Sequence, residues 1–147
     1  MSTVSRPWTC TLHLPHDPRA PGIARATLRT VLAAHDLSPL TPTAELVAAE
    51  LLANAHAHTD GPCALRLLGR ESGRVTVAVW DTDPRVPPGF AADAVPEPVP
   101  DDDAESGRGL HLVRACADSW GVSVLRELGT SRRGKLLWAD CQSRVLQ

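Results

Sequence analysis

A long segment inside the chain contains too many prolines to form a helix or a strand. Six prolines occur from Pro84 to Pro100, and six acidic residues from Asp93 to Glu105 have no basic residue among them. Each proline lacks a backbone N–H donor, so this density excludes regular hydrogen-bond ladders. Long structureless loops within small domains are usually functional or disordered. We therefore expect residues 88–106 to form a mobile loop between two blocks of regular structure.

The block before this loop is predicted to contain one strand, two helices and a hairpin. Residues 8–14 alternate in polarity between two prolines and predict a strand. Asp17-Pro18 and Thr41-Pro42 are typical helix starts, and the second helix should end near His58. The apolar face expected for the first helix consists of Ile23, Thr27, Leu28, Val31 and Leu32.

The hairpin and the block after the loop complete the expected fold. Residues 63–81 predict two strands around a turn at Ser72-Gly73. Residues 107–120 predict a helix with Ser106 as its cap, followed by strands over 121–128 and 134–141. This order predicts an α+β fold, a two-layer sandwich with helices on one face of a mostly antiparallel mixed sheet. The whole chain, residues 1–147, is expected to form one domain.

Composition excludes several classes of function. The 15 basic and 17 acidic residues nearly cancel, so net charge indicates neither a nucleic-acid partner nor a membrane surface. No apolar run reaches the roughly 20 residues of a membrane span, and the N-terminus lacks a signal-peptide core, so we expect a cytoplasmic protein. Four scattered cysteines are expected to be small core residues.

One polar stripe occurs on the otherwise apolar second helix. Glu50, Asn54 and His58 are spaced by four residues and share one helix face. Either this stripe faces solvent, or its carboxylate and amide oxygens hold a cation such as Mg²⁺. A zinc site from His56, His58 and Asp60 is not expected, because positions two apart on a helix diverge.

Two further segments carry polar groups suited to a ligand. Gly107 and Gly109 begin a helix directly after the loop, which would leave backbone N–H groups free for phosphate. Asp81 follows an apolar strand, where it either caps a turn or accepts a hydrogen bond from a ligand amine.

The order and spacing of these segments resemble a known family. "ELLANAHAH", "DTDPRVP", "GRGLHLV" and "GKLLWAD" are similar to the ATP-binding domain of DNA gyrase, ninety-kilodalton heat-shock chaperones and sensor histidine kinases. This is the GHKL superfamily, with the Bergerat fold. The chain most resembles its small bacterial branch of anti-sigma factors, which are serine kinases acting on anti-anti-sigma proteins.

The resemblance implies a role for each segment. Asn54 would bind Mg²⁺ on the ATP phosphates, and Glu50 would be the general base for a serine hydroxyl or a water. Asp81 would accept from the adenine amino group. The phosphates would be bound at Gly107, Arg108, Gly109 and Leu110, and residues 88–106 would be the lid over ATP. His58 would pack at the helix end, while His56 would be exposed.

The resemblance also implies partners, and it leaves alternatives open. A sigma factor or a STAS-type anti-anti-sigma protein would bind the chain, and a homodimer is compatible with it. Asp83, Leu136 and Glu105 depart from the family pattern, with Leu136 standing where a threonine near adenine is usual. The alternative is a nucleotide-occupied binding module without phosphotransfer. A sensor histidine kinase fragment is disfavoured, because a strand and a helix replace the dimerisation helix.

Overall fold

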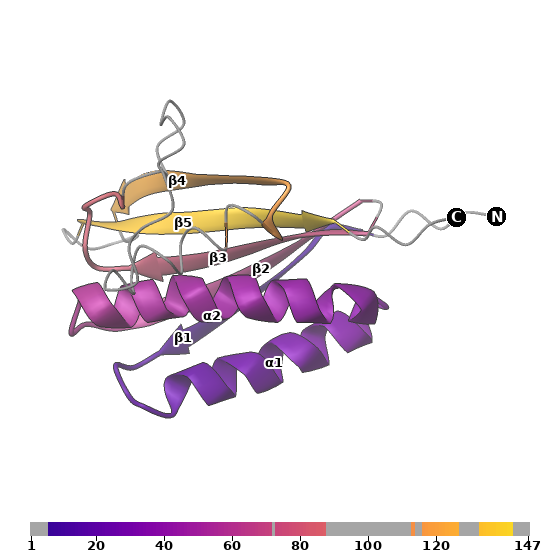
Figure 1. Cartoon of the computed structure of the whole chain (residues 1–147), viewed down its shortest axis with the longest axis horizontal. Helices are drawn as coiled ribbons and strands as arrows, with labels where there is room; N and C mark the ends of the chain where they lie inside the picture. The colour runs from indigo at the N-terminus through magenta and orange to yellow at the C-terminus, as the bar shows by residue number, and fades with distance from the viewer. Residues whose placement is uncertain (1–5, 72, 88–112, 114–115, 127–132, 143–147) are drawn as a thin grey trace.

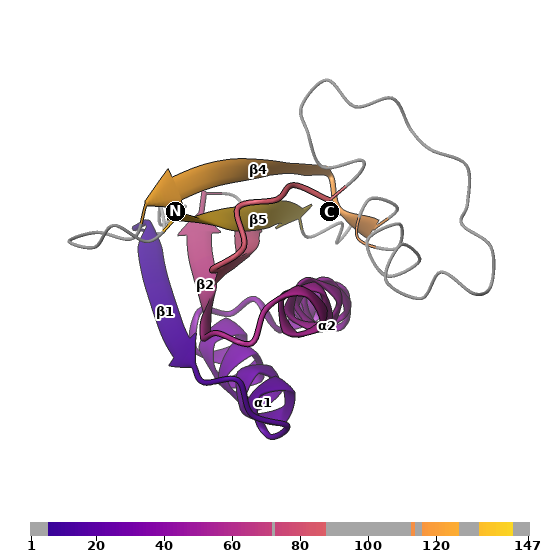
Figure 2. The same ribbon diagram turned by 90° about the vertical axis from the view of Figure 1, so that its left-hand side faces the viewer.

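The fold consists of two helices packed on one face of a sheet (Figures 1 and 2). The computed structural model describes residues 6–71, 73–87, 113, 116–126 and 133–142. Neither described helix is both long enough and apolar enough to cross a membrane. The elements are β1 (Trp8–Leu14), α1 (Ala20–Ala34), a 3-10 turn (Ser38–Leu40), α2 (Thr41–His58), β2 (Cys63–Arg70), β3 (Arg74–Asp81), β4 (Ser119–Arg126) and β5 (Arg133–Gln142).

The five described strands form one sheet in the order β1-β2-β3-β5-β4. Every neighbouring pair is antiparallel, so the described sheet is purely antiparallel and not mixed. The α+β architecture with helices on one face is confirmed. Strands β3 and β5 come from opposite sides of the proline-rich segment, and their register places Asp81 directly opposite Lys135. The sheet thus joins the two blocks of the chain at its centre.

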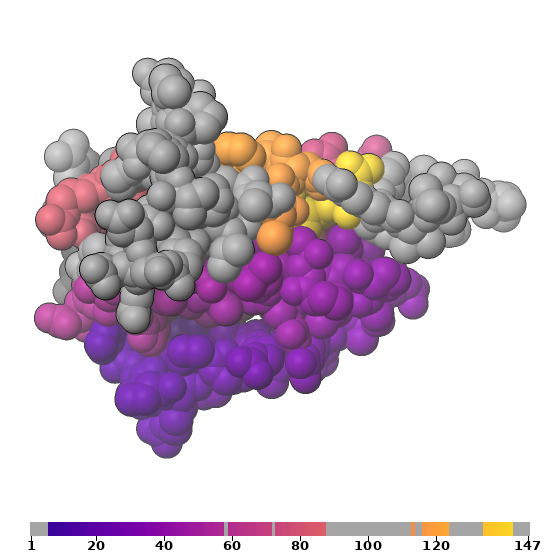
Figure 3. Space-filling view, in the orientation of Figure 1, coloured from indigo at the N-terminus to yellow at the C-terminus, as the bar shows by residue number. Residues whose placement is uncertain are grey.

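The core lies between the helices and the inner face of the sheet. Alternate residues of each strand point to the helices, since side chains in a strand alternate between its faces. In β3 and β5 these buried inner residues are Val75, Val77, Val79, Leu137, Ala139 and Cys141. The space-filling view shows the helices forming one side of the described molecule, below the strands (Figure 3).

On the outer face of the sheet, two tryptophan side chains pack directly against glycines of the neighbouring strand. An added Cβ at Gly121 would come within 2.4 Å of Trp138, and one at Gly134 would come within 2.8 Å of Trp80. At Gly134 the carbonyl oxygen of Asp81 would also lie only 2.3 Å away. Glycine is therefore required at these positions by close packing.

Helix α1 differs from the expectation in its start and in its buried face. It begins at Ala20, and the carboxylate of Asp17 accepts the Arg19 N–H at 2.7 Å in the turn before it. Ala20, Ala24, Leu28 and Leu32 are buried. Ile23 is 50% exposed, so its predicted place in the core is wrong. The small Ala24, one position further on, is buried in its place.

Helix α2 begins and ends where the sequence predicts. Its buried side is formed by Ala44, Val47, Ala48, Leu51, Leu52 and Ala55. The exposed side carries alanines, at positions 49, 53 and 57. Tertiary packing, more than an amphipathic pattern, therefore holds this helix in place.

The other boundaries agree with the prediction except near residue 119. The hairpin of β2 and β3 turns at Gly73, whose φ of 71° is readily adopted by glycine. Strand β4 begins at Ser119, so the predicted helix over 107–120 extends too far. Of that predicted helix the structure describes Val113 and residues 116–120, and of these Val113 and Cys116 are helical. The predicted loop over residues 88–106 lies outside the described residues.

Candidate functional site

The side chain of Asn54 is buried without a hydrogen-bond partner. Only 5% of the residue is exposed, and neither Nδ2 nor Oδ1 meets a partner within the described part of the chain. A buried amide without partners costs free energy, so such groups are rare unless a ligand satisfies them. This orphaned amide is the strongest sign of a ligand site on α2.

Glu50 lies one helical turn before Asn54 and on the same side of α2. It is half-buried and has no hydrogen-bond or ion-pair partner among the described residues. The C-terminal half of α2 lies at the same end of the molecule as the C-terminal end of β3 (Figure 1). A carboxylate and an amide oxygen thus share one helix face, and both are hard ligands of the kind that Mg²⁺ prefers.

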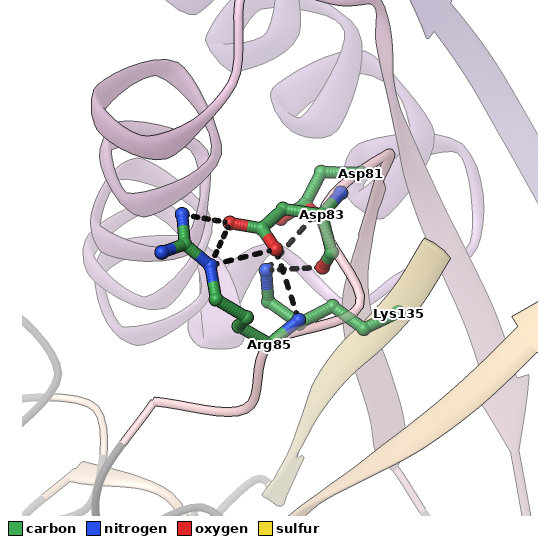
Figure 4. Close-up of polar contacts among 4 residues, drawn as sticks. All are labelled: Asp81, Asp83, Arg85 and Lys135. Atoms are coloured by element: carbon green, nitrogen blue, oxygen red, sulfur yellow. Dashed lines mark hydrogen bonds and ion pairs between the residues drawn. The ribbon is translucent and has the colours of Figure 1, made fainter. Parts of the chain in front are cut away.

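Asp81 ends β3 and forms a buried ion pair with Lys135 at the start of β5 (Figure 4). The Lys135 Nζ lies 2.9 Å from Asp81 Oδ1, and both side chains are 1% exposed. The backbone N–H of Asp83 donates to the same oxygen at 2.8 Å. Asp81 therefore caps the turn after β3, as one of its two predicted roles required, and is held by a cation as well.

The same ammonium group also binds the turn that follows β3. Lys135 Nζ donates to the backbone oxygen of Asp83 at 2.9 Å. Within the described residues these two bonds leave one Nζ hydrogen without an acceptor, and Asp81 Oδ2 without a donor. The pair thus holds Asp81 through Oδ1, and no described residue donates to its Oδ2.

Asp83, which departs from the family pattern, is neutralised by its neighbour Arg85. The two side chains form an ion pair at 2.8 Å (Figure 4). This hydrogen-bonded guanidinium lowers the pKa of Asp83 to about 2. The repulsion that a second free carboxylate would exert on a nucleotide is therefore largely offset.

Lys135 is the site residue that the sequence reasoning missed. Inner positions of β5 alternate as Lys135, Leu137, Ala139 and Cys141, so Lys135 lies in the row that forms the core. The alternation could have identified Lys135 from the sequence, because a charged side chain in a row of buried apolar residues requires a partner. Leu136, which the family comparison placed beside the adenine, lies in the alternate row, away from Asp81. Neighbouring strand residues face opposite ways, so the Leu136 side chain does not reach Asp81 in this fold. The family correspondence at Leu136 stays a prediction.

His56 is less exposed than the sequence predicts. Its ring stacks on His16 with centroids 4.9 Å apart, and its buried Nε2 atom has no partner among the residues that the structure describes. Burial of the ring, with a smaller contribution from His16, lowers the pKa of His56. The described residues contain no cluster of three or more metal-binding side chains, and the His58 side chain lies outside them.

The predicted phosphate-binding segment cannot be compared with the structure. Gly107, Arg108, Gly109 and Leu110 lie outside the described residues, as does Glu105. The roles of these residues therefore stay predictions. The described part of the site consists of the α2 stripe and the Asp81–Lys135 pair.

Comparison with known proteins assigns the family. Residues 14–137 match the family described as the histidine kinase-like ATPase domain. The chain belongs to this family. It is also 45% identical over 67 residues to an uncharacterized protein of Streptomyces coelicolor. That alignment covers 46% of this chain and 58% of the relative, less than two thirds of its length.

Family membership supports ATP binding, and the described residues fit ATP with Mg²⁺. The orphaned Asn54 amide offers a metal an oxygen that no other described residue uses. Asp81 Oδ2, to which no described residue donates, offers an acceptor to a base amine. Both groups are buried in this conformation, so a ligand reaches them only when covering atoms move aside. The GHKL-type ATPase fold expected from the sequence is thus confirmed.

Proposed function

We propose that this chain is an ATP-binding regulator that phosphorylates a serine or threonine on an anti-anti-sigma partner of the STAS type. In this proposal it also binds a sigma factor, and phosphorylation of the antagonist controls that binding. ATP is the phosphoryl donor, and Mg²⁺ accompanies it. The order of the four segments that resemble the anti-sigma branch supports this assignment.

The observation that carries the ATP half of the proposal is the orphaned amide of Asn54. Its burial costs stability unless a ligand satisfies it. In the proposal Asn54 Oδ1 is a ligand of Mg²⁺, which when bound neutralises charge on the phosphates. In the proposal the phosphates contact backbone N–H groups from Gly107 to Leu110, where the sequence predicts a helix start.

The phosphotransfer half rests on Glu50. Its carboxylate has no partner among the described residues and lies one turn from Asn54. In the proposal Glu50 takes the proton of the acceptor hydroxyl as that oxygen attacks the γ-phosphorus. A new phosphorus–oxygen bond forms to the partner, and the bond to ADP breaks. A positioned base of this kind typically contributes 10²- to 10⁴-fold in rate.

Recognition of the adenine base rests on Asp81. Its Oδ2 oxygen accepts the amino group of adenine in this proposal. Asp81→Asn should weaken ATP binding, because the amide can present a donor where the carboxylate only accepts. Equal affinity of the wild-type protein for ATP and GTP would contradict this role.

The experiment separates binding from transfer with Glu50→Ala. The purified chain is incubated with Mg²⁺, γ-labelled ATP and candidate STAS proteins from the same genome. We expect wild-type protein to label a partner on serine or threonine. The variant should bind ATP at least as tightly, because it loses an anion beside a polyanion, yet label the partner 10²- to 10⁴-fold more slowly.

A matched control variant is Ala49→Gln, which changes an exposed neighbour on the same helix. It should leave both binding and labelling unchanged. Full labelling by the Glu50 variant would remove Glu50 as the base. Wild-type protein that binds ATP but labels no partner would instead favour the alternative, a nucleotide-occupied binding module without phosphotransfer.

A further inference from the structure

We infer that Lys135 determines the base selectivity of this site by restricting Asp81 to one free acceptor oxygen. The inference rests on the proposed nucleotide binding at Asp81 and adds a residue that the family pattern does not supply. Lys135 is a positioning residue, acting on the base through Asp81. It selects adenine nucleotides over guanine nucleotides.

The first step concerns why Asp81 is held in one orientation. Oδ1 accepts two hydrogen bonds, from Lys135 Nζ at 2.9 Å and from the Asp83 N–H at 2.8 Å. Rotation of the carboxylate would break both, and neither side chain has water beside it at 1% exposure. The orientation of Asp81 is therefore set by its two partners. No described residue donates to Oδ2, and in this inference Oδ2 is the oxygen that accepts from the ligand.

The second step concerns why a lysine occurs at position 135, in the buried inner row of β5. A buried ion pair is rarely favourable for stability compared with apolar residues of similar size. Lys135 lies in the apolar inner row of β5, where Leu137 follows it. A charge kept at such a position is better explained by specificity than by stability. Its only described acceptors are Asp81 and the turn that Asp81 caps.

The third step compares the edges of the two purine bases. Adenine carries an amino donor where guanine carries the O6 acceptor, so Oδ2 attracts the first and repels the second. Guanine could bind only by shifting its two neighbouring N–H donors onto both carboxylate oxygens. Lys135 prevents this by occupying Oδ1.

The test measures dissociation constants for ATP and GTP by competition with a fluorescent ATP analogue. Lys135→Met removes the cation with little change in length, and we expect the ratio of GTP to ATP dissociation constants to fall ten- to hundredfold. Arg74→Met is the matched control, because it removes a cation of the same sheet that contacts Asp140 and not Asp81. It should leave the ratio unchanged.

A second variant keeps the test decisive if the methionine variant does not fold. Lys135→Ala leaves room for water beside the carboxylate, and the same fall in the ratio is expected. Thermal unfolding without nucleotide establishes that each variant is folded. An unchanged ratio of GTP to ATP dissociation constants in either folded variant would overturn the inference. Failure of both variants to fold would also overturn it, because the Asp81–Lys135 pair would then be purely structural. Wild-type protein that binds neither nucleotide would instead refute the proposed function itself.

Discussion

Asn54→Leu should stabilise the protein without nucleotide and abolish ATP binding. Asn54 Nδ2 and Oδ1 are both buried without partners in the described chain, on a helix whose buried neighbours include Leu51 and Ala55. Leucine has nearly the same size and no polar atoms to satisfy. The substitution therefore removes a desolvation penalty without opening a large cavity or overfilling the core.

The magnitude follows from the cost of an unsatisfied buried group. Removing such a group recovers about 1–3 kcal/mol, and we take about 2 kcal/mol for this amide. For a domain near 150 residues, 1 kcal/mol shifts the melting temperature by about 2–4 °C, so Tm should rise by about 4–8 °C. With MgATP at a hundredfold excess over its dissociation constant, wild-type protein gains about 2.7 kcal/mol and the variant gains none. Saturating nucleotide should therefore cancel or reverse the difference in stability.

The assay combines urea unfolding with and without MgATP and calorimetric titration of ATP. Ala53→Leu is the control, because it adds the same side chain to an exposed position of the same helix. Its stability should change by less than about 0.5 kcal/mol, and it should still bind ATP. A variant of Asn54 that is less stable than wild type without nucleotide, or that binds ATP normally, would refute the reasoning.

Three further predictions follow from the structure. Arg85 lowers the pKa of Asp83 to about 2 from 3.8, so their ion pair stabilises the fold at pH values above 3.8 and loses this effect as the pH falls toward 2. Arg85→Met should therefore be slightly less stable than wild type at pH 7, and urea unfolding should show no difference between them near pH 2. Burial raises the pKa of Cys63 to about 11 and of Cys141 to about 12, so both should react with thiol reagents at pH 8 only after unfolding, as peptide mapping can check. Gly134→Ala should cost about 1–3 kcal/mol in urea unfolding, because the new methyl group meets a carbonyl oxygen of β3; an unchanged midpoint would show that the strands can separate there.

Local pattern was sufficient for most elements of the fold. Alternation marked β1 and the hairpin of β2 and β3, and the proline starts marked α2, because strand and helix periods are properties of the backbone itself. The wrong prediction that Ile23 of α1 is buried also came from local pattern. Ile23 and Ala24 differ in hydrophobicity, but the distance between helix and sheet decides which of them is buried.

The candidate site was likewise predicted from the sequence only in part. Sequence placed Glu50 and Asn54 on one helix face, because their spacing of four is a local relation. The Asp81–Lys135 pair was not predicted, since it joins residues on strands that are separated by the whole proline-rich segment. Periodicity could place each of them in an inner row, while only strand pairing could place one opposite the other.

The sequence by itself determined the elements, the apolar rows, the family resemblance and the polar stripe on α2. The tertiary structure alone decided that the buried Asn54 amide has no partner in the described part of the chain and that Lys135 holds Asp81. The physical reason is that burial and partnership depend on which atoms of distant segments exclude water from a group. Backbone periodicity specifies the direction of a side chain, but desolvation is set by everything that packs around it.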